Sequence, residues 1–200
     1  MNHEWKPYLI HGQKRTFSKG QMLFLQGEES HGIYFLENGK VNILLLSEDG
    51  KERIVEYVIG KALIGETGIL GQPYLTSAKC ETKSTFYYYP LENIKHLCQQ
   101  HPKAKEILMK SMSNKVQMLT ETMSMTDKPF EQQMAYFLLQ LYRKHNTLSV
   151  PISQISLAQY IGTSRITIYK IMQKWEKEGI ASQGKKKINI LDLEKMKTLL

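Results

Sequence analysis

The sequence predicts an α+β fold in which a β jelly roll is followed by a long helix and a C-terminal winged helix-turn-helix. Three observations support it: short β-rich runs separated by glycine turns, an apolar repeat in the middle, and two short helical segments before a lysine-rich hairpin. We expect three parts: a barrel at residues 1–101, a helix at 102–127 and a C-terminal domain at 128–200.

The N-terminal runs are strand-like because β-branched, aromatic and leucine side chains dominate them. They lie at residues 22–25, 33–36, 41–46, 54–58 and 84–89. Asn38-Gly39 and Asp49-Gly50 fall between runs and predict hairpins, since both central turn positions must accept positive φ. No helical segment interrupts the runs, which favours an antiparallel barrel or jelly roll over an α/β sheet.

The middle segment predicts a dimerisation helix from Pro102 to about Thr126. Apolar residues recur there at alternating spacings of three and four, as in a coiled-coil seam: Met109, Met112, Val116, Leu119 and Met123. The polar residues between them are expected in solvent: Lys110, Lys115, Gln117 and Glu121. A homodimer follows from the seam, although the same period would suit a helix packed on its own barrel.

The C-terminal segment predicts a helix from Pro129 to about Lys144 and then a helix-turn-helix. Ser153 is placed to cap a first helix, and Gly162 allows the positive φ expected in the turn that follows. A second helix runs from about Arg165 to Glu178. The apolar side of that second helix is expected to be buried: Ile168, Ile171, Met172 and Trp175.

The net charge of +8 is concentrated in this same segment. Residues 1–127 carry 15 Lys and Arg against 14 Asp and Glu, a net of +1, whereas residues 128–200 carry 12 against 5, a net of +7. This asymmetry favours a polyanionic partner, with nucleic acid the leading candidate, although charge alone leaves a solvated basic surface open.

The residues left exposed on the second helix are the candidates for contacting double-stranded DNA: Ser164, Arg165, Ile166, Thr167, Tyr169, Lys170 and Gln173. Arg165 suits a bidentate contact to guanine or a phosphate clamp, and Ile166 suits a thymine methyl group. We expect Ser164 and Thr167 at phosphates and Lys170 at a base or phosphate. Gln173 either contacts DNA or is simply exposed to solvent.

Residues 180–190 predict a strand, a turn and a strand, which would form the wing. Lys185 and Lys186 lie in or just after that turn and are expected to meet backbone phosphates. A solubilising charge run is the alternative for this lysine triplet.

Other function classes find little support. Cys80 and Cys98 are too few for a disulfide framework, and neither a secretory signal pattern nor a membrane-length apolar run occurs, so we expect a cytoplasmic protein with no membrane contact. Motifs of known enzymes are missing, so no catalytic residue is named and we expect no enzymatic activity.

Cofactors are not expected either. The two cysteines are too few and too late for an iron–sulfur cluster. His96, Cys98 and His101 cannot converge on a helix, because positions 96 and 98 point about 200° apart. We therefore expect no metal site and no haem.

The chain resembles a known family in five short landmarks, whose order and spacing match the cyclic-nucleotide-binding jelly roll: Lys19-Gly20, Gln26-Gly27-Glu28, Ile33-Tyr34, Gly39-Lys40-Val41 and Ile64-Gly65-Glu66. With the long helix and the winged helix-turn-helix, residues 17–197 resemble the catabolite-activator/Fnr (Crp/Fnr) family of transcription regulators. The resemblance implies a homodimeric, sequence-specific regulator of a palindromic operator. A small molecule in the barrel would control it, and RNA polymerase is a further candidate partner.

The resemblance also assigns an effector pocket to the barrel and the long helix: Gly65, Glu66, Thr67, Thr76, Ser77, Met118, Thr122 and Met123. In cyclic-nucleotide binders of the family, an arginine beside Ser77 would hold the cyclic phosphate, whereas Thr76 stands here. A neutral hydroxyl cannot offset a buried phosphate charge, so we expect an effector other than cyclic AMP. Glu66 either contacts that ligand or only supports the turn.

Ile166 also departs from the family pattern, because many members carry an acidic residue directly after the Ser-Arg pair. The familiar half-sites are therefore not expected, and the chain looks most like a non-nucleotide branch that includes sensors of small aromatic (haloaromatic) compounds. Two alternatives stay open: an effector-independent DNA-binding regulator and a nucleotide-sensing protein-interaction module. The operator, the regulated genes and the direction of control are not predicted.

Overall fold

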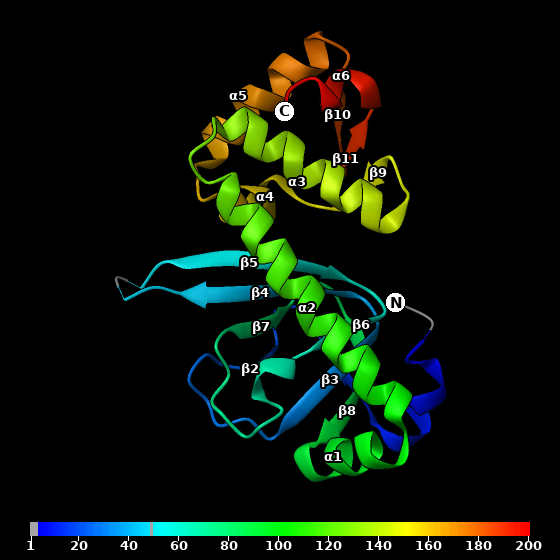
Figure 1. Ribbon diagram of the computed structural model, residues 1–200. Helices are drawn as coiled ribbons and strands as arrows, with labels where there is room; N and C mark the ends of the chain where they lie inside the picture. The colour runs from blue at the N-terminus through cyan, green and yellow to red at the C-terminus, as the bar shows by residue number, and fades with distance from the viewer. Residues whose placement is uncertain (1–3, 49) are drawn as a thin grey trace. The chain divides into compact units, whose positions relative to one another are not determined.

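The computed structural model describes residues 4–48 and 50–200, and the chain divides into two compact units (Figure 1). The first unit ends at Thr120 and the second runs from Glu121 to Leu200, so the long helix contributes to both.

The first unit is built on two four-stranded antiparallel sheets. One has the strand order β1 (Gln13–Phe17), β8 (Ser84–Pro90), β3 (Gly32–Asn38) and β6 (Ala62–Ile64). The other has the order β2 (Met22–Phe24), β7 (Ser77–Cys80), β4 (Lys40–Leu46) and β5 (Glu52–Ile59). A shared core joins the sheets, with Tyr34, Leu36 and Phe86 from the first meeting Phe24, Val41 and Val58 from the second. The predicted jelly roll is confirmed.

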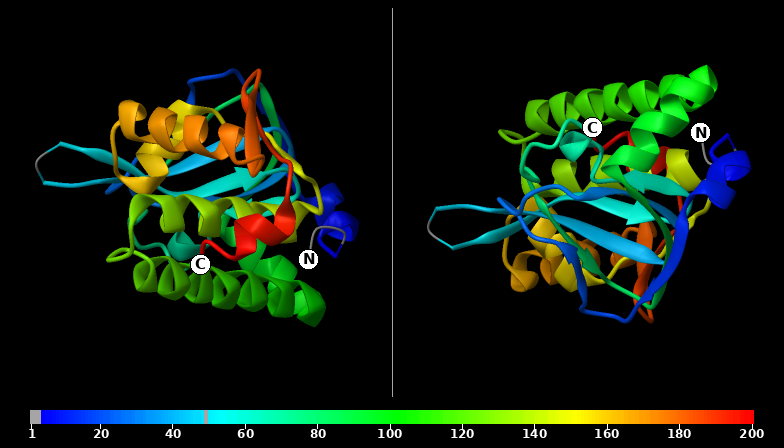
Figure 2. Two further views of the ribbon diagram at one scale, coloured as in Figure 1. Left: turned by 90° about the horizontal axis from the view of Figure 1, so that it is seen from above. Right: turned by 90° about the horizontal axis from the view of Figure 1, so that it is seen from below.

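The two predicted hairpins differ in outcome. Asn38-Gly39 does not form a hairpin, because β3 and β4 belong to different sheets, and Gly39, at φ 115°, turns the chain from one sheet to the other. A Cβ at Gly39 would lie 2.1 Å from Ser84 Oγ, so close packing requires glycine there as well. β4 and β5 do pair as a hairpin that projects from the barrel (Figure 2). Asp49, predicted in its turn, lies outside the described residues.

A second apolar layer covers the outer face of the first sheet. The short 3-10 helix η1 (Lys6–His11), α1 (Leu91–Gln100) and α2 (Pro102–Ser124) pack there, so residues from both faces of β3 are buried. Trp5 is 1% exposed and its indole nitrogen donates to the Tyr89 hydroxyl at 3.0 Å. This layer attaches the N-terminal part of α2 to the barrel.

The second unit contains three main helices and a small sheet. α3 (Phe130–His145) is followed by β9 (Ser149–Val150), α4 (Gln154–Ile161), α5 (Arg165–Lys177), β10 (Ala181–Gly184), β11 (Lys187–Ile190) and α6 (Leu193–Lys197). The strands form one antiparallel sheet in the order β10-β11-β9. The predicted helix-turn-helix and wing are both confirmed, within a residue or two at each end.

Candidate DNA-binding and effector sites

The turn between α4 and α5 is held by caps that the sequence encodes locally. Ser153 Oγ accepts from the Ser156 backbone N–H at the start of α4, and Ser164 Oγ accepts from Thr167 N–H at 3.1 Å at the start of α5. Gly162, at φ 78°, ends α4 in the left-handed region. These contacts fix where α5 begins and therefore which of its residues are exposed.

One face of α5 is buried and the opposite face is exposed. Ile168, Met172 and Trp175 are at most 1% exposed, and Ile171, also predicted as buried, is half-buried. The exposed side carries a stripe at positions i, i+3, i+4 and i+7: Ile166, Tyr169, Lys170 and Gln173. Ile166 is 67% and Tyr169 51% exposed, and the two lie on the same side of the helix.

The DNA-binding candidates on α5 also include two kinds of polar side chain, hydroxyl groups that cap the helix and exposed positive charges. Ser164 and Thr167 bond to each other across the start of α5, their hydroxyl oxygens 2.9 Å apart, so their side chains have a structural role. Arg165 and Lys170 are exposed, and neither forms an ion pair within residues 4–48 and 50–200. Lys174, by contrast, pairs with Glu131.

Glu131 joins α3 to the back of α5. Its carboxylate accepts from the Lys174 ammonium at 2.9 Å and from the Trp175 indole N–H at 2.8 Å. Since Trp175 is buried, this bond satisfies a donor that would otherwise lack a partner. The orientation of α5 in the unit therefore depends on a carboxylate that the sequence did not single out.

The wing is a tight hairpin between β10 and β11. Gly184 pairs with Lys187, which leaves Lys185 and Lys186 as the two turn residues, both exposed and without an ion pair among the described residues. Lys186 has φ 57°, a left-handed conformation that non-glycine residues rarely adopt. The hairpin thus presents two free ammonium groups at its tip.

In the first unit, Glu66 lies at the start of the 3-10 helix η2 (Glu66–Gly68) and is only 2% exposed. Its carboxylate accepts from Ser111 Oγ and from the Lys115 ammonium, both at 2.5 Å and both from α2. Lys115 also donates to the Leu63 carbonyl at 3.0 Å and lies 4.0 Å from the Glu56 carboxylate. The carboxylate assigned to the effector is thus bonded to the chain's own helix.

The charges of this cluster stabilise one another. Burial by itself raises the pKa of Glu66, but the Lys115 ammonium and the hydrogen bonds from Lys115 and Ser111 outweigh it and hold that pKa below the ordinary value. Burial lowers the pKa of Lys115, and the neighbouring Glu66 and Glu56 carboxylates raise it above the ordinary value. Both members of the pair are therefore charged at neutral pH.

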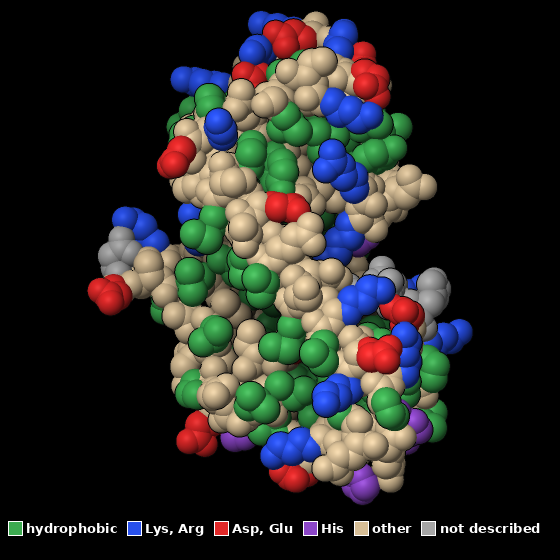
Figure 3. Space-filling model, viewed as in Figure 1, with side chains coloured by type: hydrophobic (Ala, Val, Ile, Leu, Met, Phe, Trp, Pro, Cys, Tyr) green, Lys and Arg blue, Asp and Glu red, His purple; other side chains and the backbone are tan. Residues whose placement is uncertain are grey.

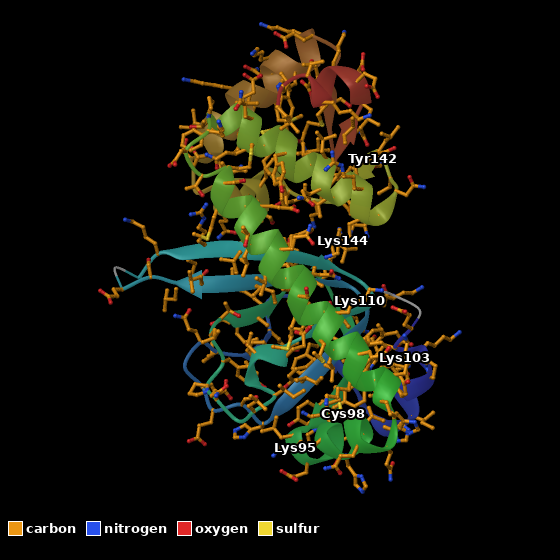
Figure 4. All side chains as sticks on the ribbon, in the orientation of Figure 1. Lys95, Cys98, Lys103, Lys110, Tyr142 and Lys144 are labelled. Atoms are coloured by element: carbon orange, nitrogen blue, oxygen red, sulfur yellow. The ribbon has the colours of Figure 1, made fainter. Side chains whose placement is uncertain are left out.

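Ser111 and Lys115 are site residues that the sequence did not predict, and the expectation that Lys115 is solvated is wrong. Its side chain is 25% exposed. The signal was available, because Ala104, Leu108, Ser111 and Lys115 follow one another at spacings of three and four along the buried side of α2. Lys103 and Lys110, labelled in Figure 4, instead pair at the surface with Glu106 and Glu4.

The remaining predicted pocket residues of the barrel differ in their exposure and contacts. Gly65, at φ 86°, precedes η2, Thr67 is exposed, and Thr76 is half-buried. Ser77 is buried and its hydroxyl accepts from the Gln26 backbone N–H at 2.9 Å.

The three pocket candidates on α2 also differ from one another. Met118 is half-buried in the first unit. Thr122 and Met123 belong to the second unit, where the Thr122 hydroxyl lies 3.3 Å from the Tyr160 hydroxyl and Met123 is 74% exposed.

The predicted coiled-coil seam is exposed along its whole length. Met109, Met112, Val116, Leu119 and Met123 are 63%, 38%, 65%, 43% and 74% exposed. The side of α2 that packs on the barrel carries a different set: Ala104, Ile107, Leu108 and Ser111. Figure 3 shows hydrophobic side chains on the face along which α2 runs. The helix therefore has two apolar sides, and the described residues cover only one of them.

Two further observations concern sites of other kinds. Among the described residues, no group of three or more His, Cys, Asp and Glu side chains is placed to hold a metal ion. No helix in that part of the chain is long and apolar enough to cross a membrane.

Two family models match the chain, one to each part of the architecture. The cyclic nucleotide-binding domain matches residues 14–101, and the Crp-like helix-turn-helix domain matches residues 132–199. The first contains Glu66 and the segment from Gly65 to Ser77, called the cassette below, and the second contains the exposed face of α5 and the wing.

Known proteins are similar over most of the chain. The transcriptional activator protein Anr of Pseudomonas aeruginosa is 24% identical, with 89% of this chain and 76% of that protein covered. The fumarate and nitrate reduction regulatory protein of Vibrio cholerae is 25% identical, with 90% and 75% covered.

Solved structures share the fold. FixK2 from Bradyrhizobium japonicum has a TM-score of 0.83 at 15% identity, with 94% of this chain and 96% of that one covered. CprK complexed with OCPA has a TM-score of 0.75 at 20% identity, with 99% and 94% covered. Both family models, the curated relatives and the shared architecture agree, and the chain is a DNA-binding transcription regulator of the Crp/Fnr family.

Proposed function

We propose that the protein acts as a homodimer that binds a palindromic operator, with one α5 in each major groove and the wing lysines on the adjacent phosphates. The observation that carries this proposal is the exposed stripe of α5 next to Arg165; within residues 4–48 and 50–200, neither Arg165 nor the stripe residue Lys170 forms an ion pair. A recognition helix needs such a face, because base edges are read by side chains that project from it. The wing tip supplies Lys185 and Lys186 as phosphate contacts.

Dimerisation through α2 is supported by the exposed seam. Five large apolar side chains in coiled-coil register would gain from burial, at roughly 1.5–3 kcal/mol for each one fully removed from water. The covering surface that matches such a seam is a second copy of the same helix. In functional terms we divide the chain into a sensing barrel at residues 1–101, a dimerisation helix at 102–127 and a DNA-binding domain at 128–200.

The barrel, in our proposal, does not take cyclic AMP. Thr76 supplies no positive charge for a cyclic phosphate, and the Glu66 carboxylate already has Ser111 and Lys115 as donors. An effector that used Glu66 would first have to displace the Lys115 ammonium. A small molecule can bias such a regulator only if it binds one conformation more tightly than the other.

The Lys115–Glu66 pair also favours a second candidate, a regulator that needs no effector. In that case the ion pair would take the place of the ligand and hold α2 on the barrel permanently. A nucleotide-sensing module without DNA binding is less well supported, because it would leave the exposed face of α5 and the net charge of +7 in residues 128–200 without a role.

The experiment that tests the proposal is binding-site selection from a random duplex pool, with wild-type protein and with Arg165→Ala. The selection is run with and without a bacterial small-molecule extract. We expect a palindrome with half-sites about one helical turn apart, and a weaker base preference for the variant. Enrichment without extract supports the effector-independent regulator, and enrichment only with extract supports the sensor. No enrichment in either condition would contradict sequence-specific DNA binding.

A further inference from the structure

We propose that Gln173, held in position by Tyr169, reads an adenine in each operator half-site. The inference rests on the proposed function, since it names the base that one position of the α5 face recognises. It starts from a single contact on the exposed side of α5, where the Gln173 side-chain amide donates to the Tyr169 hydroxyl at 2.7 Å.

Position favours contact with bases over phosphates for Gln173. At about 100° per residue, Ile166, Tyr169, Lys170 and Gln173 fall within one narrow sector of α5, opposite the buried Trp175. A recognition helix lies in the major groove with its N-terminal residues at the base edges. Within the outward sector, we take the side chains near its middle to face the groove and those at its sides to face the two backbones. Gln173 lies near the middle of the sector and one turn beyond Tyr169.

The donors and acceptors of the Gln173 amide then determine which base it can recognise. A glutamine amide has two N–H donors and one carbonyl acceptor, and the bond to Tyr169 occupies one N–H. One N–H donor and the carbonyl acceptor of the amide are left for a base. Adenine presents the matching pair in the major groove, an N7 acceptor next to an N6 donor.

Guanine presents two acceptors, N7 and O6, at the same edge. The carbonyl oxygen of Gln173 would then face an acceptor, and one polar group would lose its partner on binding. The geometry therefore discriminates between the two purines and favours adenine.

Tyr169 has a positioning role in this proposal. A glutamine side chain has several rotatable bonds, and fixing them on binding costs free energy. The bond to the Tyr169 hydroxyl fixes the amide before DNA arrives, which preserves more of the gain from the base contact. Ile166, 67% exposed on the same stripe, adds a surface that suits a thymine methyl group, so the two residues together favour A·T pairs.

The test uses the duplex that the wild-type protein selects, and measures its dissociation constant as each adenine is replaced in turn. The replacements are guanine, 7-deazaadenine, which lacks the N7 acceptor, and purine, which lacks the N6 amino group. For the wild type we expect one adenine in each half-site where all three weaken binding by about tenfold or more. Gln173→Ala should bind the original duplex more weakly and be insensitive to replacement at that adenine.

Two further variants separate the roles. Tyr169→Phe removes the hydroxyl and keeps the ring, so we expect a smaller preference at the same adenine with unchanged preferences elsewhere. Gln100→Ala, an exposed glutamine on α1, should behave as the wild type. Near-ultraviolet circular dichroism checks that each variant is folded.

The outcomes are distinguishable. If the wild-type protein selects no sequence in either extract condition, the proposed function itself fails. If it selects a sequence but no adenine shows sensitivity to 7-deazaadenine, or if Gln173→Ala keeps that sensitivity, only this inference is overturned. If Gln173→Ala does not bind, the analogue measurements on the wild type still overturn the inference when no adenine is sensitive, and a reduced sensitivity in Tyr169→Phe assigns a sensitive adenine to the Tyr169–Gln173 pair.

Discussion

The Lys115 ammonium on α2 donates to the buried Glu66 carboxylate of the barrel at 2.5 Å, with Ser111 completing the contact. The bond joins the cassette that family resemblance assigns to a ligand with the helix whose other side forms the predicted dimer seam. Any change of charge at Glu66 therefore acts directly on the position of α2 in the first unit.

Removing one partner of this pair is predicted to destabilise the first unit more than removing both. Glu66→Gln leaves Lys115 without its main partner, and Lys115→Met leaves a buried carboxylate uncompensated. We expect each single change to cost about 2–4 kcal/mol, below the cost of breaking a fully buried pair because Lys115 is one quarter exposed. The double variant should cost clearly less than the sum. Chemical denaturation measures all four proteins, and additive losses would contradict the coupling.

The same pair predicts a pH dependence. The pKa of Glu66 is depressed below 4.5 in the folded state, so its contribution to stability is complete above that value and is lost as pH falls through the folded pKa. The pKa of Lys115 is raised above 10.5, so its contribution is complete below that value and is lost at higher pH. We expect denaturation midpoints of the wild type to fall at both extremes, and less steeply for the double variant. Parallel pH profiles for the two proteins would contradict the assignment.

Cyclic AMP is predicted not to stabilise the protein. A ligand that binds only the folded state raises the melting temperature with its concentration. Because Thr76 offers no positive charge and Glu66 is already bonded, we expect no shift with up to millimolar cyclic AMP in a thermal denaturation series. The selected operator duplex serves as the positive control. A rise that saturates with cyclic AMP would show that the pocket accepts the nucleotide.

A charge in the α2 seam is predicted to prevent dimerisation. Leu119→Glu places a carboxylate in the middle of the exposed apolar stripe, twice in each dimer, where its burial is strongly unfavourable. We expect a monomer by sedimentation equilibrium and a loss of operator affinity of at least about tenfold. Gln117→Glu introduces the same group on α2 outside the seam and should leave the dimer intact. A monomeric wild type, or a dimeric Leu119→Glu, would show that α2 does not carry the interface.

The wing is predicted to contribute affinity without sequence preference. Lys186→Asn removes the charge and keeps a residue that tolerates the positive φ of this position. We expect all duplexes to be weakened by a similar factor, and the plot of log affinity against log salt to flatten by about one for each contacting wing. Lys83→Asn, at an exposed barrel lysine, is the control. Loss confined to particular sequences would mean that Lys186 contacts a base.

Glu131 is predicted to hold α5 in place. Glu131→Ala removes the acceptor of the Trp175 indole N–H and leaves that donor without its partner. We expect the second unit to lose about 1–3 kcal/mol of stability and operator binding to weaken. Lys174→Ala removes only the surface member of the cluster and should have a smaller effect. Tryptophan fluorescence during denaturation reports the loss, with a Trp5→Phe background to isolate Trp175. Unchanged stability in Glu131→Ala would contradict this role.

Much of the secondary structure was predictable because its signals are local. The cap at Ser153, the turn at Gly162 and the apolar period of α5 all depend on residues within a few positions, and each is found where the sequence indicates. Ser164 caps α5 in the same way, a role that was not predicted from the sequence. Once the buried side of α5 had been predicted, its remaining residues defined the exposed face. Asn38-Gly39 shows the limit of such reasoning, because a dipeptide encodes a turn but not the strands that will pair on either side of it.

The sequence by itself determined the order of elements, the basic C-terminal third, the helix-turn-helix with its cap at Ser153 and the apolar repeat of α2. Only the tertiary structure decided the partners of the charged residues. Lys115 lies 49 positions from Glu66, and Glu131 lies 43 from Lys174, so neither pairing leaves a local pattern. A periodic repeat shows that a helix has an apolar side, but which of two sides the barrel covers depends on packing between distant segments. For α2 that packing buries Ser111, half-buries Lys115 and leaves the seam exposed.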